Sequence, residues 1–367
     1  MSRTLVVEAD LVTAWGHGAA ACWRGLLSGS PAFSEIRRFD CAALQSRLAA
    51  LVPELHPDPS RSLVMGLLKP LLAEAAGRIP RDALVLLATT TGEVDLLETA
   101  PADSRLDRLL ARVCDLCQAR EPGRIVSAAC ASSTAALAVG ASLIRGKKRE
   151  AVLVVACDAV TEFIVAGFSS LFALDPDGAR PFDRHRKGLT IGEAAAFALL
   201  MSEERAAREK RRALGEIAGW GLSGDANHMT GPSRDGEGLA LAVRQALRSA
   251  DVPAERIGSI SAHGTGTLYN DSMELKAFKK VFQRPIPMYS IKGSVGHTMG
   301  AAGLVETILA LESLHEQVAP PTANLREVDP EAGAWVSPAP VETRGMEAAL
   351  TTNSGFGGLN AALVLKA

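Results

Sequence analysis

One cysteine, Cys130, stands where a short apolar segment meets a run of very small residues. Residues 124–140 read Arg-Ile-Val-Ser-Ala-Ala-Cys-Ala-Ser-Ser-Thr-Ala-Ala-Leu-Ala-Val-Gly, which predicts a buried strand followed by a helix. A thiol in the first turn of that helix faces free backbone N–H groups and the positive end of the helix dipole, which favour the nucleophilic thiolate. Because a cysteine among alanines is also typical of a core, this segment alone is not decisive.

Two histidines stand beside glycines, each after a segment that reads as a strand. His263 lies in Ser-Ala-His-Gly-Thr-Gly-Thr and His297 in Gly-His-Thr-Met-Gly-Ala-Ala-Gly. Glycine removes bulk, so that a ligand or another backbone can come close. Two of only seven histidines in such frames indicate a site shared with Cys130. These three residue types also suit zinc, but their glycine and threonine neighbours offer no evident second shell, so we expect no metal.

These three motifs together resemble those of the elongating β-ketoacyl synthases of the Cys-His-His type, the condensing enzymes of fatty-acid and polyketide synthesis. The resemblance implies a decarboxylative Claisen condensation that gives a 3-oxoacyl thioester and CO2. In that reaction Cys130 holds the acyl group as a thioester. His263 and His297 donate hydrogen bonds to the enolate that forms when malonyl-acyl carrier protein loses CO2. No cofactor is expected, because phosphopantetheine arrives on the carrier protein.

The resemblance extends to a lysine and a glutamate near His297. It implies that Lys292 and Glu306 form a buried ionic network that orients the site. Alternatively, Lys292 is a solvated strand end and Glu306 a charge on a helix surface. The apolar and glycine neighbours of Lys292 favour burial, whereas the sequence around Glu306 leaves both interpretations open.

Three further residues are assigned by the same resemblance. The hydroxyls of Thr265 and Thr267 would bind the amides of the phosphopantetheine arm. Phe356, within Gly-Phe-Gly-Gly, would gate the site, and its backbone N–H would complete an oxyanion hole with that of Cys130. The alternatives are ordinary turn threonines and a glycine-rich hairpin with one core aromatic.

Other polar clusters give weaker predictions. Cys114 and Cys117 have the spacing of a redox or zinc pair, but no second pair exists, and we interpret them as structural thiols. Residues 175–178 read Asp-Pro-Asp-Gly and resemble a calcium loop; the required glutamate spacing is missing, so a turn is expected.

Strand-like and helix-like segments alternate along the chain, which predicts an α/β fold. The resemblance implies the thiolase-like five-layer α-β-α-β-α fold made from two similar halves. We place the half that carries the nucleophile at residues 1–208 and the half that carries both histidines at 209–367. Predicted strands are 5–7, 83–88, 151–156, 194–201, 257–262, 288–291, 348–352 and 361–365, and predicted helices are 19–27, 63–76, 132–146, 238–250, 271–282 and 301–317.

The bulk composition sets limits on partners and location. The chain has 367 residues, a formal net charge of −2 and six cysteines. This charge favours no nucleic-acid partner. No apolar run is long enough for a membrane span, and with no secretory signal the cysteines predict a cytoplasmic protein with reduced thiols. The resemblance implies an acyl carrier protein as partner, and a homodimer or a heterodimer with a related synthase subunit.

Several departures from the family pattern point to a specialised enzyme of secondary metabolism. The interval 91–124 is short where the family carries an insertion that helps form the dimer contact and the acyl pocket. Alanines occupy 194–196 where glycines are usual, and an aromatic residue is missing beside Ser354. The alternative function is a non-catalytic partner resembling a chain-length factor. Such partners usually lose the nucleophile, so the retained Cys130 favours activity.

Overall fold

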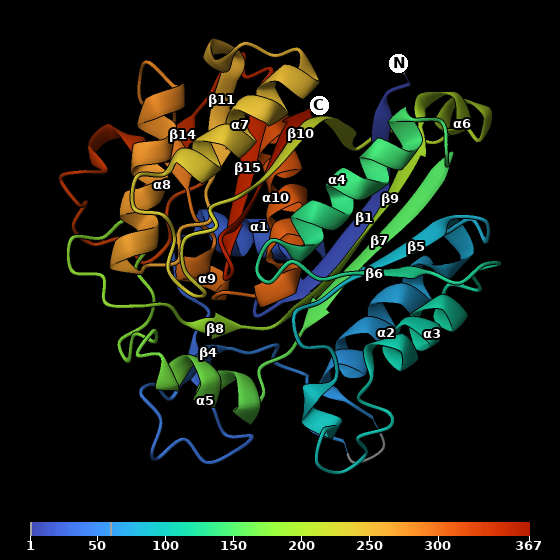
Figure 1. The fold of residues 1–367 in the computed structure, drawn as a ribbon, viewed down its shortest axis with the longest axis horizontal. Coiled ribbons are helices and arrows are strands. Elements are labelled where there is room, and N and C mark those ends of the chain that lie inside the picture. Colours follow the sequence, from blue (N-terminus) through green and yellow to red (C-terminus); the bar gives the residue numbers. More distant parts are fainter. Residues whose placement is uncertain (1, 59–60) are drawn as a thin grey trace.

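The computed structural model describes residues 2–58 and 61–367 (Figure 1). Its central feature is a mixed β-sheet made of two five-stranded parts, and the parallel and antiparallel pairings follow the same order in both parts. In each part the first three strands run antiparallel to their neighbours and the last three run parallel. The strands, from the junction outward, are β1 (Thr4–Thr13), β9 (Ala194–Ser202), β7 (Ala151–Asp158), β5 (Leu84–Ala88) and β6 (Arg124–Val126) in one part, and β10 (Gly215–Gly224), β16 (Leu359–Lys366), β15 (Ala348–Gly355), β11 (Ile257–Ser261) and β12 (Met288–Tyr289) in the other.

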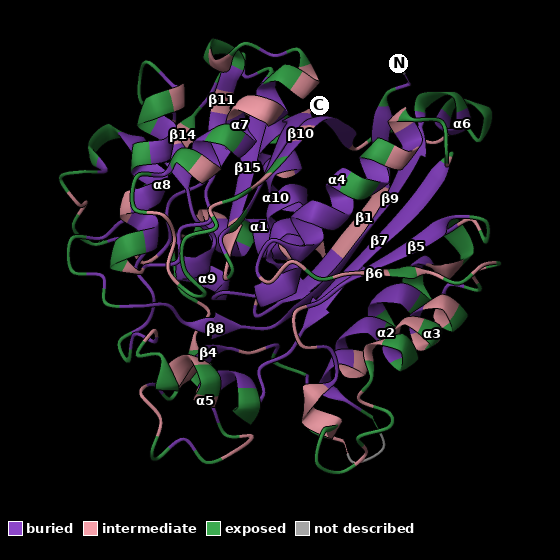
Figure 2. Cartoon of the chain, in the orientation of Figure 1, coloured by how far each residue is buried: buried purple, intermediate pink, exposed green. Residues whose placement is uncertain are grey.

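The two parts are joined where β1 pairs with β10, and the printed register pairs Leu5 with Glu216 and Val6 with Gly215. Two helices lie between the parts: α4 (Ser132–Arg145) and α10 (Ala302–Glu316) contact each other and strands of both. Figure 1 shows this pair at the centre of the molecule. Since the middle layer is covered on both sides, many of its side chains belong to one large buried cluster; in Figure 2 it is mostly purple, with exposed residues on the outer part of α4.

The outer layers are helices that cover the far faces of the two parts. The helix α2 (Leu63–Ala75) packs on β1, β7 and β9, with α3 (Leu106–Leu116) beside it. The helix α7 (Glu237–Ala250) packs on β10 and β16, with α8 (Leu268–Val281) beside it. The strands β5, β7 and β9 are buried at every residue and almost wholly apolar, as expected when both faces are covered. The predicted five-layer α/β fold is confirmed, while the boundary between residues 208 and 209 stays a prediction.

Shorter elements surround this frame. None of the helices in 2–58 and 61–367 is both long and apolar enough to cross a bilayer.

Cys114 and Cys117 are free thiols, and residues 175–178 form a turn in which Asp177 N–H donates to the Asp175 carboxylate. The remaining helices and strands are β2 (Gly16–His17), α1 (Ala19–Leu27), β3 (Ser34–Glu35), β4 (Leu48–Ala50), α5 (Glu162–Ser170), β8 (Ile191–Gly192), α6 (Glu203–Arg208), α9 (Lys292–Val295), β13 (Val318–Ala319) and β14 (Val341–Glu342), together with five short 3-10 segments.

The strand β10 was not predicted from the sequence, and its glycines explain why. Gly219 and Gly221 interrupt the apolar pattern of the strand. A Cβ at Gly221 would lie 2.0 Å from the carbonyl oxygen of Ala242, and one at Gly219 would lie 2.4 Å from that of Ala246. These glycines therefore let α7 pack directly against the backbone of β10.

We predict that Gly221→Ala lowers the free energy of unfolding by about 1–3 kcal/mol, because the added methyl group cannot fit without moving α7. Gly224→Ala in the same strand is the matched control, since a Cβ there meets nothing within 4 Å. Urea unfolding of the two variants measures the difference. Equal stability of the two variants would contradict this packing.

Candidate active site

Cys130 lies in a tight turn between β6 and α4. Ala129, just before it, has a φ of +49°, a left-handed conformation that is uncommon outside glycine. The Ser132 hydroxyl holds this turn, because it accepts the N–H of Ala128 at 2.8 Å and donates to the carbonyl of Ala129 at 2.6 Å. Cys130 is only 6% exposed. The turn therefore presents the sulfur to the interior of the site rather than to open solvent.

The structure corrects the expected ionisation of this thiol. Burial raises the pKa of Cys130 to about 11, and the opposing effects of the Lys292 charge and of the backbone N–H of Phe356 do not compensate. Cys130 precedes the first helical residue, Ser132, by two positions and so lies outside the first turn of α4. A helix dipole acts mainly within that turn, so the prediction of a favoured thiolate was wrong. The resting group at neutral pH is the thiol.

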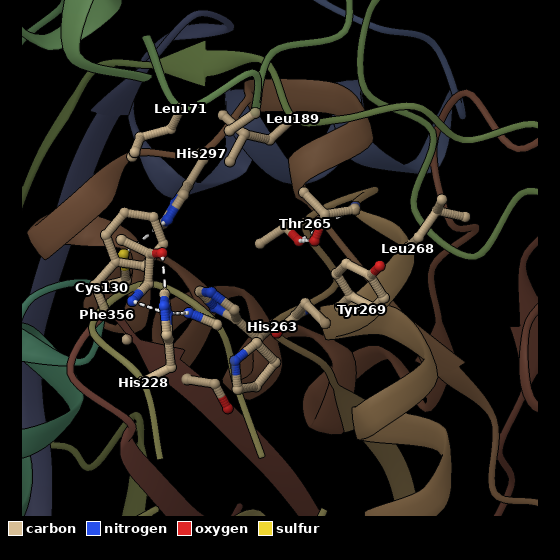
Figure 3. A pocket seen from close by; sticks show the side chains of 18 of the residues that line it. Cys130, Leu171, Leu189, His228, His263, Thr265, Leu268, Tyr269, His297 and Phe356 are labelled. Atoms are coloured by element: carbon tan, nitrogen blue, oxygen red, sulfur yellow. Dashed lines mark hydrogen bonds between the residues drawn. The ribbon is translucent and has the colours of Figure 1, made fainter. Parts of the chain in front are cut away.

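The rings of His263 and His297 lie edge to face beside this sulfur, with centroids 5.2 Å apart. The Nε2 atom of His297 is 3.0 Å from Cys130 Sγ, an interaction drawn in Figure 3. Burial, reinforced by the nearby Lys292 charge, holds the pKa of both imidazoles well below the usual value. Both rings are therefore neutral, and each has one N–H donor and one acceptor nitrogen.

Backbone and side-chain donors decide which ring nitrogen carries the proton. The N–H of Met299 donates to His297 Nδ1 at 3.3 Å. The amide nitrogen of Asn353 lies 3.3 Å from His263 Nδ1. Since Nδ1 acts as the acceptor in both rings, the proton of each neutral imidazole sits on Nε2.

Lys292 and Glu306 form a fully buried ion pair behind the imidazoles. The amide nitrogen of Asn353 donates to the second carboxylate oxygen of Glu306 at 2.7 Å. Burial raises the pKa of Glu306, although Lys292 beside it acts in the opposite direction. A buried charge requires such partners, so the pair also fixes the position of Asn353. Lys292 begins the short helix α9, directly after β12, and is not part of a strand.

Three buried acceptors that hold the site were not identified from the sequence. The Glu274 carboxylate accepts the backbone N–H groups of His263 at 2.7 Å and Gly264 at 2.6 Å, and burial raises its pKa to about 8. The Asp158 carboxylate accepts the N–H of Gly300 at 2.7 Å and further donors from residues 89–91. Asn353 is the third. A detectable signal is the polar residue that ends an otherwise apolar strand, as Asp158 does in β7; Asn353 lies within β15, after two threonines, and has no such signal.

A cavity of about 670 Å³ opens from the sulfur and both imidazoles to the surface. Thr265 and Thr267 line it, with their hydroxyl oxygens 2.9 Å apart. Phe356 also lines the cavity, at the tip of the β15–β16 hairpin. The structure thus brings six of the eight predicted site residues to one cavity (Figure 3), and places Lys292 and Glu306 behind its wall.

The hairpin that carries Phe356 packs directly on the nucleophile turn. A Cβ on Gly355 would lie 3.0 Å from the carbonyl oxygen of Ala128 and 3.1 Å from the nitrogen of Cys130. The backbone N–H of Phe356 interacts with the Cys130 sulfur. This close approach brings the backbone of the hairpin next to that of the nucleophile turn.

The donor atoms of Cys130, His263 and His297 lie within 4.8 Å of one another, close enough for one metal ion. A metal-bound histidine needs a free electron pair on the ligating nitrogen, and its other nitrogen usually donates a hydrogen bond. Here the inner Nε2 atoms carry the protons, and the outer Nδ1 atoms accept. The arrangement therefore fits two hydrogen-bond donors facing a thiol and does not fit a metal site.

Comparison with known proteins gives consistent results. Residues 109–206 match the model of the β-ketoacyl synthase N-terminal domain, and residues 214–326 match that of the C-terminal domain. The chain is 30% identical to 3-oxoacyl-[acyl-carrier-protein] synthase 2 of Vibrio cholerae, with 99% of each chain covered. It is 33% identical to the putative polyketide β-ketoacyl synthase 1 of Streptomyces virginiae, over 95% of this chain and 86% of that protein. The solved structure of the ishigamide ketosynthase/chain length factor is similar over 100% of this chain and 99% of the other, with a TM-score of 0.88 and 29% identity.

The raised pKa of Cys130 predicts the pH dependence of its alkylation. Because the thiolate fraction keeps growing until the pH approaches the folded-state pKa of about 11, we expect the rate with iodoacetamide to rise still between pH 8.5 and 10. Mass spectrometry of the peptide that contains Cys130 gives this rate. A short cysteine peptide is the control, and its rate should level off near pH 9. A plateau for Cys130 below pH 8 would show that the thiolate is favoured after all.

Proposed function

The chain belongs to the β-ketoacyl synthase family, and on that premise we propose that it joins an acyl group on Cys130 to a malonyl unit from malonyl-acyl carrier protein. The observation that carries this proposal is the convergence of one thiol and two neutral imidazoles, with their Nε2–H groups facing a single cavity. A condensing enzyme needs a nucleophile together with donors for developing negative charge, and this cavity holds both.

The first half-reaction loads the nucleophile. Cys130 attacks the carbonyl of an acyl thioester, and the backbone N–H groups of Cys130 and Phe356 stabilise the oxygen anion of the tetrahedral intermediate. The bond from carbon to the carrier sulfur then breaks. The leaving thiolate takes up the proton that Cys130 gives up, which balances the step. Acyl transfer between two sulfur atoms needs no other reactant.

The second half-reaction forms the carbon–carbon bond. The malonyl thioester loses CO2, and the electron pair of the broken bond moves into an enolate. His263 and His297 each donate an Nε2–H bond to its oxygen, and both rings are neutral because of their burial and of the nearby Lys292 charge. The enolate carbon attacks the acyl group on Cys130, and the sulfur leaves as a thiolate, which takes up a proton from water to restore the resting thiol. A 3-oxoacyl thioester remains on the carrier.

The mouth of the cavity supports delivery of substrates by a carrier protein. Cys130 lies at its inner end, so an acyl group must reach it on a flexible arm. Thr265 and Thr267 on the cavity wall would bind the amides of phosphopantetheine, which arrives on the carrier. Exposed apolar residues at the mouth, among them Phe172 at 81% and Tyr269 at 60% exposure, suit a protein partner.

We extend the proposal to assembly and location. The solved structures that resemble this chain include a ketosynthase in complex with its chain length factor from Xenorhabdus doucetiae, at 27% identity and a TM-score of 0.83. We therefore propose a homodimer or a heterodimer with a related subunit. Six cysteines without a disulfide are consistent with a cytoplasmic enzyme. The short interval 91–124 and the missing aromatic beside Ser354 favour a role in secondary metabolism.

We predict that mixing the protein with an acyl-carrier thioester adds the mass of the acyl group at Cys130. Intact-protein mass and peptide mapping measure it, with Cys130→Ala as the control that takes up nothing. A parental protein that never acquires the adduct would favour the alternative of a non-catalytic partner resembling a chain-length factor.

We further predict that Cys130→Gln releases CO2 from malonyl-acyl carrier protein without condensation, because both imidazoles remain in place. Adding His263→Ala or His297→Ala should lower this release by about 10²–10³-fold, as for the loss of an oxyanion donor. Release of CO2 at the unchanged rate in these double variants would overturn the assignment of the two histidines.

A further inference from the structure

A buried hydroxyl on the helix of the nucleophile donates a hydrogen bond to a side chain in the half of the molecule that carries the histidines. Thr134 is fully buried on α4, four residues after Cys130. Its hydroxyl donates to the side-chain oxygen of Asn353 at the end of β15, in the other half. The next residues of α4, Ala135 and Ala136, have no polar side-chain atom. A buried hydroxyl in such surroundings is expensive unless it is hydrogen-bonded, so this contact fixes Thr134 and Asn353 together.

The neighbouring helix α10 leaves room for this contact. A Cβ on Gly303 would lie 1.8 Å from the Thr134 hydroxyl oxygen and 2.8 Å from the Asn353 side-chain oxygen. Any larger residue at position 303 would therefore displace the hydroxyl. Glycine at this position therefore leaves the space that the hydrogen bond between the two halves requires.

The Thr134 contact and the Glu306 carboxylate together set the orientation of the Asn353 amide. With its oxygen held by Thr134, the NH2 group faces Glu306, to which it donates at 2.7 Å, and His263 Nδ1, which is 3.3 Å away. The reverse orientation would turn the amide oxygen toward the Glu306 carboxylate, which is repulsive. An N–H directed at Nδ1 keeps the His263 proton on Nε2, the nitrogen that faces Cys130.

We propose that Thr134 is a positioning residue for His263: acting through Asn353, it fixes the imidazole as an Nε2–H donor directed into the cavity. Its catalytic consequence rests on the proposed function, in which that donor stabilises the enolate. The effect of Thr134 on the ring does not rest on the proposed function, because the position of the proton on His263 can be observed without any reaction.

The test compares Thr134→Val, which keeps the shape and removes the hydroxyl, with Thr134→Ser, which restores it. In ¹⁵N-histidine spectra at pH 7.5, the parental protein and Thr134→Ser should show His263 as the pure Nε2–H form. Thr134→Val should show a mixture of the two neutral forms, while His297, held by Met299, should not change. Circular dichroism verifies folding, and Thr134→Ala replaces the valine variant if that does not fold.

Activity gives a second, separate result. In the Cys130→Gln background, Thr134→Val should release CO2 from malonyl-acyl carrier protein about tenfold more slowly, as for one lost hydrogen bond, and Thr134→Ser should recover to within about twofold. In proteins that keep Cys130, its acylation should remain within about twofold of the parental rate in both Thr134 variants. An unchanged His263 spectrum in a folded Thr134→Val protein would overturn the inference. A parental protein without any condensing activity would instead refute the proposed function. The spectra would still decide whether Thr134 positions His263.

Discussion

The arrangement of the site depends on one buried ion pair, that between Lys292 and Glu306. Two charges in a dry interior are tolerated only when each has its partner, and removing one partner of such a pair typically costs about 3–5 kcal/mol. Burial, reinforced by the Lys292 charge, keeps His263 and His297 neutral. Glu306 in turn orients Asn353, and Asn353 orients His263.

The reacting groups come from opposite halves of the fold, so their positions depend on the layer between the halves. The N-terminal half supplies the sulfur, on a strained turn that leads into α4. The C-terminal half supplies both imidazoles and the ion pair. The helices α4 and α10 pack closely because Gly303 leaves room between them. Buried side chains of both halves form the surrounding cluster, and this dense packing resists the small displacements that would separate donor from reacting atom.

Much of this was predictable from the sequence because it is local. Apolar runs indicated the buried strands β5, β7 and β9. Glycine-flanked motifs indicated His263 and His297, and the junction of an apolar segment with a run of small residues indicated Cys130. The strand β10 was not predicted, because glycines that allow close contact with α7 interrupt its apolar pattern. The raised pKa of Cys130 could not be predicted from the sequence, because it depends on burial by segments that are distant along the chain. The hydrogen bond from Thr134 to Asn353 joins residues that are 219 positions apart, and no local sequence pattern at either residue predicts it.

The central claim is that both imidazoles are neutral donors in the resting protein, with the proton on Nε2. The most direct measurement is a ¹⁵N-histidine titration of the unmodified protein between pH 5.5 and 8. The account predicts that the signals of His263 and His297 stay in the neutral Nε2–H form throughout this range, because the folded-state pKa of each lies well below 6.5. Protonation of either ring with a midpoint near pH 6.5, or a proton on Nδ1 of either ring, would contradict it.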